Sequence, residues 1–213
     1  MDPSLAYDRP VGHMADRSVM YPSGMPGEAR TAVGHRTREA LLDAGIAVAE
    51  RHGLAGLSVN RVVAEAGVAK GTFYVHFADR GVFIDALHER FHALVHSAVA
   101  EATRDMPAGA EFLVRSAEAY LDVSLENRVV KALALEARSD PTFTASMSAR
   151  HDRLASAAIP SFEAMGWPDP TAAAQLMVAM TAEIAVRELD AGSRLPASRR
   201  ALRRFLGVPG QRP

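Results

Sequence analysis

Apolar residues recur at helical spacing along most of the chain, from about His35 nearly to its end. In the first such segment Leu41, Leu42 and Ile46 share one helical face, and Gly53 predicts the end of that helix. Signals for strands are few, because alternating β-branched runs and Asn-Gly turns are missing. The pattern therefore predicts an all-α protein.

Capping and turn residues divide the remaining chain into further helices. Ser58 is a good N-cap for a short helix that ends at Gly67, and a second short helix is predicted at about 69–77. Asp79 is expected to cap a long helix that reaches Arg104. Proline starts and glycine ends then predict five more helices, near 109–126, 128–138, 141–165, 170–190 and 197–206.

Composition narrows the classes of function that this fold can serve. The 213 residues are 48% hydrophobic, which is enough for one large domain or two small ones. Since there is no cysteine, disulfides, thiolate metal sites and cysteine nucleophiles are excluded. No apolar run approaches the ~18 residues of a membrane span, and no N-terminal signal is visible. We therefore expect a cytoplasmic protein without membrane contact.

The two short helices and the glycine between them form a helix-turn-helix pattern. Ala64 offers a small side chain where the second helix is expected to cross the first, and Gly67 tolerates a turn with positive φ. Val68, Phe73 and Phe77 are expected to anchor the second helix. The other side chains of that helix would then face DNA, namely Lys70, Gly71, Thr72, Tyr74 and His76.

The block LSVNRVVAEAGVAKGTFYVHF, residues 57–77, closely resembles the DNA-binding signature of the TetR family of repressors. The resemblance covers about residues 36–90, and it departs from the family at Ala69 and Gly81. It implies phosphate contacts from Ser58, Tyr74, His76 and Arg80. It also implies base-edge or groove contacts from Asn60, Lys70, Gly71 and Thr72, with Arg61 nearby.

The same resemblance implies a domain organisation and a function. We expect a tail at 1–34, a helix-turn-helix domain at 35–80, a ligand-binding and dimerisation domain at 81–208, and a tail at 209–213. The family's members bind a double-stranded, pseudo-palindromic operator as homodimers, and a small-molecule effector releases them. The sequence leaves open an activator, or a regulator that needs its ligand as a corepressor. Because the net charge is −1, any DNA-binding surface must be local.

The helices after residue 81 offer candidate residues for the effector and for the dimer. The resemblance implies that the last two long helices form the dimer interface, with Leu176, Ala179, Glu183, Leu202 and Phe205 as candidates. Few charges lie on the central helices, so we expect a small apolar or aromatic effector and no cofactor. Its candidate contacts, which ordinary core packing also explains, are Phe91, Val95, Tyr120, Ser124, Phe143, Met147, His151, Met177 and Met180.

One motif points to a different class of protein. His88, Glu89 and His92 form an H-E-x-x-H pattern, in which two histidines on one helical face bind zinc and the glutamate acts as a base. His96 continues the row, which leaves a regulatory metal site as a further alternative. No recognisable third ligand of a zinc protease follows in the sequence. We therefore interpret the chain as a non-enzymatic regulator without a metal, and zinc hydrolysis as the alternative.

Overall fold

The computed structural model describes residues 27–136 and 141–208, and the regular elements within these ranges are all helices. The all-α prediction is confirmed. The N-terminal part holds α1 (Gly27–Gly56), α2 (Val59–Ala66) and α3 (Lys70–His76), and α4 (Arg80–Ala102) leads out of it. The rest of the chain forms α5 (Ala110–Glu126), α6 (Arg128–Glu136), α7 (Pro141–Ala164), α8 (Pro170–Ala191) and α9 (Pro196–Phe205).

Most helix boundaries lie where the capping residues predict them. The Asp79 side chain accepts a hydrogen bond from the Val82 backbone N–H at 2.9 Å, as an N-cap should. Gly53 breaks the regular helix within α1 with a φ of 63°. The clearest difference is that α1 begins at Gly27, earlier than the predicted start at His35, because the residues after Gly27 include the helix formers Glu, Ala and Arg. The rest of the predicted tails, 1–26 and 209–213, lies outside the described residues.

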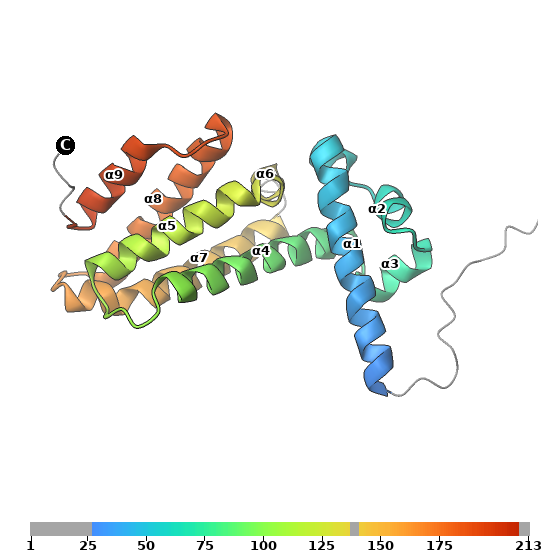
Figure 1. Cartoon of the computed structure of the whole chain (residues 1–213), viewed down its shortest axis with the longest axis horizontal. Coiled ribbons are helices and arrows are strands. Elements are labelled where there is room, and N and C mark those ends of the chain that lie inside the picture. Colours follow the sequence, from blue (N-terminus) through green and yellow to red (C-terminus); the bar gives the residue numbers. More distant parts are fainter. Residues whose placement is uncertain (1–26, 137–140, 209–213) are drawn as a thin grey trace, which may run out of the picture.

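The helices fall into two groups that α4 connects. Figure 1 shows α1, α2 and α3 together at one end, with α4 running from them into a bundle that contains α5, α7, α8 and α9. Helix α4 packs on α5, and α7 packs on α8, while α1 also contacts α6. Among the described residues, no helix combines the length and the apolar character needed to cross a bilayer.

Two apolar cores correspond to these groups, and α4 contributes to both. The N-terminal core contains Phe73, Phe77 and Phe83, whereas the C-terminal core contains residues such as Phe91 and Phe162. The N-terminal core also takes in Leu133 of α6 and Met147 of α7, so it reaches into the second group. A movement of α4, α6 or α7 would therefore change the packing of the core on which α2 and α3 rest.

A glycine sets the close approach of α1 to α4. A Cβ atom at Gly45 would lie 2.5 Å from Cζ of Phe83, which real Cβ atoms do not tolerate. Phe83 is 1% exposed and fills the N-terminal core, so it has little room to move away. Gly45 therefore lets α1 cross α4 closely and holds the N-terminal group at the start of α4.

Candidate nucleic-acid interface and effector cavity

The turn between α2 and α3 takes its geometry from Gly67. Its φ of 66° and ψ of 30° lie in the left-handed region, which glycine adopts without steric cost. The backbone N–H of Gly67 donates to the Ala64 carbonyl at 3.4 Å, and that of Val68 donates to the Val63 carbonyl at 3.0 Å. These bonds satisfy the last carbonyls of α2 and direct the chain into α3.

Helix α3 is held against the N-terminal core by aromatic packing. Phe73 is fully buried and Phe77 is 2% exposed. Their ring centroids lie 5.2 Å and 4.9 Å from that of Phe83 on α4, and the Phe77–Phe83 pair is edge-to-face. Aromatic pairs of this geometry stabilise beyond their buried area. The predicted anchors thus fix α3 as a rigid unit on α4.

The opposite side of α3 is open to solvent. Lys70, Gly71 and Tyr74 are exposed there, as predicted, and Tyr74 keeps half of its surface accessible. Val75, which the sequence interpretation did not single out, is 73% exposed. Lys70 and Tyr74 offer donors for phosphates or base edges, and Val75 offers an apolar contact of the kind that thymine methyl groups accept.

Three residues lie differently from the prediction. Thr72 is buried, so it does not face outward as expected, because it falls on the same side of this short helix as Phe73. Ala64 is exposed, so it does not lie where α2 and α3 cross, and Ala66 packs against the N-terminal core instead. His76 is half-buried; burial, together with the nearby Arg38, lowers its pKa, so it is neutral at pH 7.

The predicted residues of α2 and the start of α4 are exposed, but their arginines also bind the backbone. Ser58 and Asn60 lie at the start of α2, and the Ser58 hydroxyl accepts a 3.4 Å hydrogen bond from the Arg61 backbone N–H. The Arg61 guanidinium donates to the Gly56 carbonyl at 2.9 Å. Arg80 donates to the carbonyls of Leu57 and Leu54, each at 2.6 Å. Both arginines therefore stabilise the end of α1.

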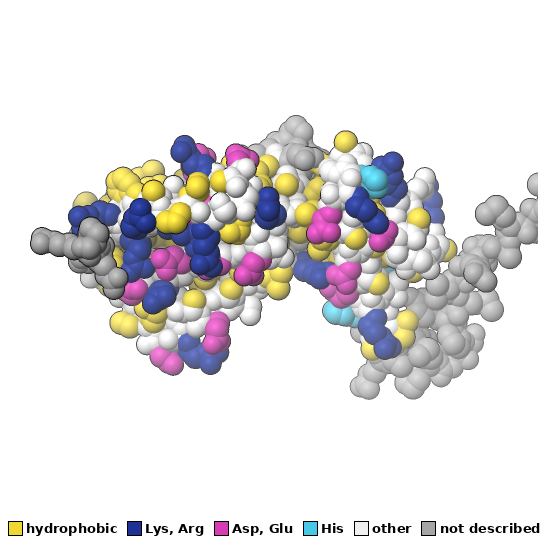
Figure 2. Space-filling view, turned by 45° about the horizontal axis from the view of Figure 1, so that its top comes forward, with side chains coloured by type: hydrophobic (Ala, Val, Ile, Leu, Met, Phe, Trp, Pro, Cys, Tyr) yellow, Lys and Arg dark blue, Asp and Glu magenta, His cyan; other side chains and the backbone are white. Residues whose placement is uncertain are grey.

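Charge on the face that Figure 2 shows is mixed rather than concentrated. In Figure 2, basic and acidic side chains are interspersed over both groups of helices on the face that is shown. Any DNA-binding surface on α2 and α3 would therefore be local, as expected from the net charge of −1.

A cavity of about 100 Å³ lies within the second group of helices. Side chains of α4, α5, α7 and α8 line it, and most of them are apolar. Among the predicted effector contacts, Val95, Tyr120, His151 and Met177 line this cavity. The cavity is partly open to solvent, and a mostly apolar hollow with a few polar groups is typical of a small-molecule site.

The other predicted effector contacts lie elsewhere. Phe91 and Ser124 are buried in the same domain but do not line the cavity, and Met180 is half-buried against the C-terminal core. Met147 belongs to the N-terminal core. The side chain of Phe143 lies outside the described residues. The apolar periodicity found the right helices but could not tell which of their residues face the cavity.

The sequence interpretation missed two buried cations, one that contacts the cavity wall and one on α7. Lys131 on α6 is 3% exposed, and its Nζ donates a 2.8 Å hydrogen bond to the hydroxyl of Tyr120, a cavity-lining residue. Arg150 on α7 is 4% exposed and forms a 2.7 Å ion pair with Asp85 on α4. The signal that could have found Lys131 is its place between Val130 and Leu133, in an otherwise apolar run.

The histidine row of α4 lies near these cations. His88 is 2% exposed, and its ring packs against His92 with centroids 4.7 Å apart. Burial, together with the neighbouring cations Arg150 and Lys131, lowers the pKa of His88 to about 2 and that of His92 to about 4. Within the described residues, no group of three or more His, Asp or Glu side chains is placed to hold a metal ion. The alternative of a metal at His88, His92 and His96 gains no support from the structure.

The candidate dimer residues lie on α8 and α9. Leu176 and Phe205 are 64% and 68% exposed, and Ala179 and Glu183 are exposed as well. Leu202 differs, because it is buried in the C-terminal core of its own chain and has no surface to offer a second copy. Exposed apolar side chains of this size on neighbouring helices suit an interface between chains.

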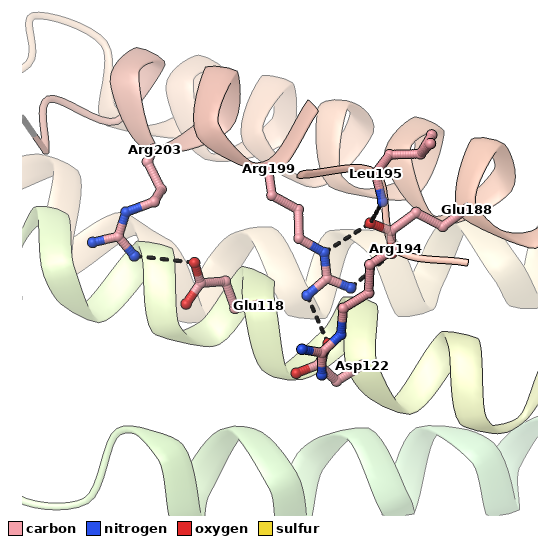
Figure 3. Close-up of polar contacts among 7 residues, drawn as sticks. All are labelled: Glu118, Asp122, Glu188, Arg194, Leu195, Arg199 and Arg203. Atoms are coloured by element: carbon pink, nitrogen blue, oxygen red, sulfur yellow. Dashed lines mark hydrogen bonds and ion pairs between the residues drawn. The ribbon is translucent and has the colours of Figure 1, made fainter. Parts of the chain in front are cut away.

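A network of ion pairs, shown in Figure 3, links helix α9 to α5 and α8. Arg199 donates two 2.7 Å hydrogen bonds to the buried Glu188 and one of 2.6 Å to Asp122. Glu188 also accepts the Leu195 backbone N–H at 2.9 Å. Burial alone would raise the pKa of Glu188, but these hydrogen bonds lower it, and they raise the pKa of Arg199. The network fixes the helix that bears Phe205.

The helix-turn-helix segment and the whole fold each match known proteins. Residues 41–87 match the family model described as bacterial regulatory proteins, tetR family. Among curated proteins, no relative matches the chain. Of the solved structures, a TetR-like transcriptional regulator from Rhodococcus sp. RHA1 is 21% identical, with a TM-score of 0.66, over 80% of this chain and 93% of its own.

Two further solved structures share the fold. The fatty acid degradation regulator FadR from Bacillus halodurans is 18% identical, with a TM-score of 0.66, over 80% of this chain and 99% of its own. The multidrug binding protein EbrR, solved with imidazole, is 24% identical, with a TM-score of 0.58, over 82% of this chain and 97% of its own. The helix-turn-helix domain of this chain is thus a tetR-family domain, and the chain as a whole has the fold of TetR-like transcriptional regulators.

Proposed function

We propose that this chain, with its tetR-family helix-turn-helix, is a transcriptional repressor that binds a pseudo-palindromic operator as a homodimer and is released by a small effector. The observation that carries this proposal is the open face of α3, where Lys70, Gly71 and Tyr74 are exposed while Phe73 and Phe77 hold the helix. A rigid helix with polar side chains and a glycine on one side suits the major groove. Its place of action would be the cytoplasm, where bacterial DNA lies.

The dimer would form through α8 and α9. Exposed Leu176 and Phe205 support this position, and the network around Arg199 holds α9 in place for it. Two copies joined there would carry their α3 helices to successive major grooves, about 34 Å apart. The operator would then have two half-sites about one helical turn apart.

Effector binding would change this spacing through α4. The helix lines the cavity with Val95 and holds α3 through Phe83, so one rigid element touches both sites. If the effector binds more tightly to a state in which α4 is tilted, it shifts the population away from the DNA-binding state. Operator and effector would then weaken each other's binding by the same factor.

The structural neighbours do not identify the effector. One is named for fatty acid degradation and another for multidrug binding. The cavity of this chain supports a small, mostly apolar molecule. An activator, or a repressor that needs its ligand, uses the same architecture, and the sign of the effector's influence on operator affinity separates these roles.

The proposal is tested by titrating the purified protein against fluorescent DNA from upstream of its own gene, and against a pool of genomic fragments, at fixed salt. We expect selective binding with two protected half-sites. Tyr74→Ala should lower the affinity by about tenfold or more, and Lys70→Ala should also reduce the salt slope by about 1.

The matched control is Arg115→Ala, because this exposed arginine lies on α5, away from α2 and α3. It should bind DNA as the wild type does. If no fragment of the pool is bound selectively, or if Tyr74→Ala binds as well as the wild type, the proposed DNA-binding function is wrong.

A further inference from the structure

Among the described residues, the charges of Lys131 and Arg150 are only partly balanced. The hydrogen-bond partner of the Lys131 ammonium is the uncharged hydroxyl of Tyr120, and the ammonium also lies 5.3 Å from the centre of that ring. One terminal nitrogen of Arg150 bonds to Asp85, whereas the other is buried and has no hydrogen-bond partner in the described part of the chain. Asp85 itself is 37% exposed and therefore offers a partly hydrated charge.

Lys131 and Arg150 both lie near His88 on α4. Arg150, Lys131 and His151 all lie near enough to His88 to lower its pKa by repulsion. The hydroxyl of Ser124 on α5, 2% exposed, has no hydrogen-bond partner within the described residues. Burying a charge without a matching partner is costly, and the cost falls when an anion with hydrogen-bond acceptors is bound.

We propose that Lys131 and Arg150 bind the carboxylate of the effector, whose small apolar body occupies the neighbouring cavity. The inference rests on the proposed function for the role of the ligand. Tyr120 links the two parts of the site, because its side chain lines the cavity and its hydroxyl bonds to Lys131. His151, next to Arg150 in sequence, also lines the cavity.

The size of the cavity limits the apolar body. A cavity of about 150 Å³ in another protein accepts benzene, and the cavity here measures about 100 Å³. The two volumes are of the same order, so we expect the buried part of the ligand to be a single ring or a short chain. Monocarboxylates such as phenylacetate and hexanoate combine a body of this size with the required charge.

The site also has a direct route to the helix-turn-helix. Arg150 of α7 pairs with Asp85 of α4, which lies close behind Phe83 in the sequence. A carboxylate bound to the other terminal nitrogen of Arg150 shares the charge of that guanidinium with Asp85 and would weaken the link between α7 and α4. Ligand binding would thereby free the helix that holds α3.

Isothermal titration calorimetry on the full chain tests this inference without DNA. The probes are phenylacetate and hexanoate, their uncharged analogues phenylacetamide and hexanamide, and inorganic phosphate. Because a hydrogen bond to a charged group contributes about 1.5–3 kcal/mol, we expect each carboxylate to bind at least about tenfold more tightly than its amide. Lys131→Met and Arg150→Met should each abolish this preference, whereas Arg115→Gln should keep it.

The preference for carboxylate over amide is a ratio, so it stays informative even if a variant is less stable. The inference is overturned if the amides bind as tightly as the carboxylates, if no carboxylate of the panel binds, or if both methionine variants keep the preference. Binding of phosphate as tight as that of the carboxylates would also overturn it, since the apolar body would then contribute nothing. Selective operator binding by the ligand-free wild type would still support the proposed function in each of these cases.

Discussion

The C-terminal domain buries two sets of charges, and they differ in how completely the protein balances them. Glu188 accepts two hydrogen bonds from Arg199 and one from a backbone N–H, and Arg199 also reaches Asp122 (Figure 3). Lys131, by contrast, bonds to a neutral phenol, and Arg150 leaves one nitrogen without a hydrogen-bond partner among the described residues. The first set stabilises α9, whereas the second retains an unmet preference for an anion.

This difference shows how a buried charge can be assigned a role. A buried ion pair whose hydrogen bonds are all made holds helices together. Removing one partner leaves the other as a buried charge without a counter-charge, which is destabilising. A buried cation with an N–H donor that lacks an acceptor destabilises the ligand-free protein, and a ligand that supplies the acceptor removes that cost. The two sets should therefore respond in opposite directions to the same kind of substitution.

The largest effect is expected for Glu188→Gln. The substitution leaves Arg199 buried with only Asp122 as a charged partner, and we expect the free energy of unfolding to fall by about 3 kcal/mol. Urea denaturation followed by circular dichroism measures this loss. The control is Glu101→Gln, which breaks an exposed pair with Arg104 on α4 and should cost less than about 0.5 kcal/mol. If the two variants lower the unfolding free energy equally, the Glu188 network does not have the structural role assigned to it.

The next largest effect is a fall of the unfolding free energy in acid, and it arises from His88, which lies near Lys131 and Arg150. His88 has a pKa of about 2 in the folded protein, because burial and nearby cations disfavour its charged form. The unfolded chain takes up this proton below about pH 6.5, so the contribution is complete above that pH and is lost as the pH falls toward 2.

We expect the unfolding free energy to fall by about 2 kcal/mol between pH 7 and pH 5 through His88 alone. Urea denaturation at a series of pH values measures this decline. His92, with a pKa of about 4, adds a similar decline, so His88→Leu should remove about half of the total. Glu101→Gln, which keeps both histidines, should leave it unchanged. A decline of the same steepness in His88→Leu would show that other groups cause it.

The smallest expected effect has the opposite sign. Lys131→Met removes a buried cation and replaces it with an apolar side chain of similar length, so we expect no loss of stability and a gain of up to about 1 kcal/mol. Thermal denaturation of the ligand-free protein measures it. If Lys131→Met destabilises as strongly as Glu188→Gln, then the two sets of charges do not differ, and Lys131 is a structural residue.

The sequence allowed the helix-turn-helix to be predicted in detail because its structure is local. Gly67, Phe73 and Phe77 act on neighbours within a few residues, so capping rules and helical spacing suffice to place them. Even there, the spacing put Thr72 on the wrong side of α3, since a helix of about two turns leaves its buried side poorly defined.

The second site could be predicted only in outline. Val95, Tyr120, His151 and Met177 were among the expected contacts, but they come together from four helices far apart in the sequence. The contact of Lys131 with Tyr120 and that of Arg150 with Asp85 depend on how those helices pack, which periodicity does not determine. Leu202 shows the same limit, because its helical spacing fits an interface and an internal core equally well.

The most direct test of the account is the operator affinity of the full chain in the presence of the carboxylate that calorimetry finds to bind most tightly. Fluorescence anisotropy at fixed salt, with and without saturating carboxylate, measures it for the wild type and for Lys131→Met. We predict that the carboxylate weakens operator binding by the wild type by about tenfold, within the usual range of allosteric coupling, and leaves no such shift in Lys131→Met. A carboxylate that binds at Lys131 and leaves the wild type's operator affinity unchanged would contradict the proposed coupling between the cavity and α3.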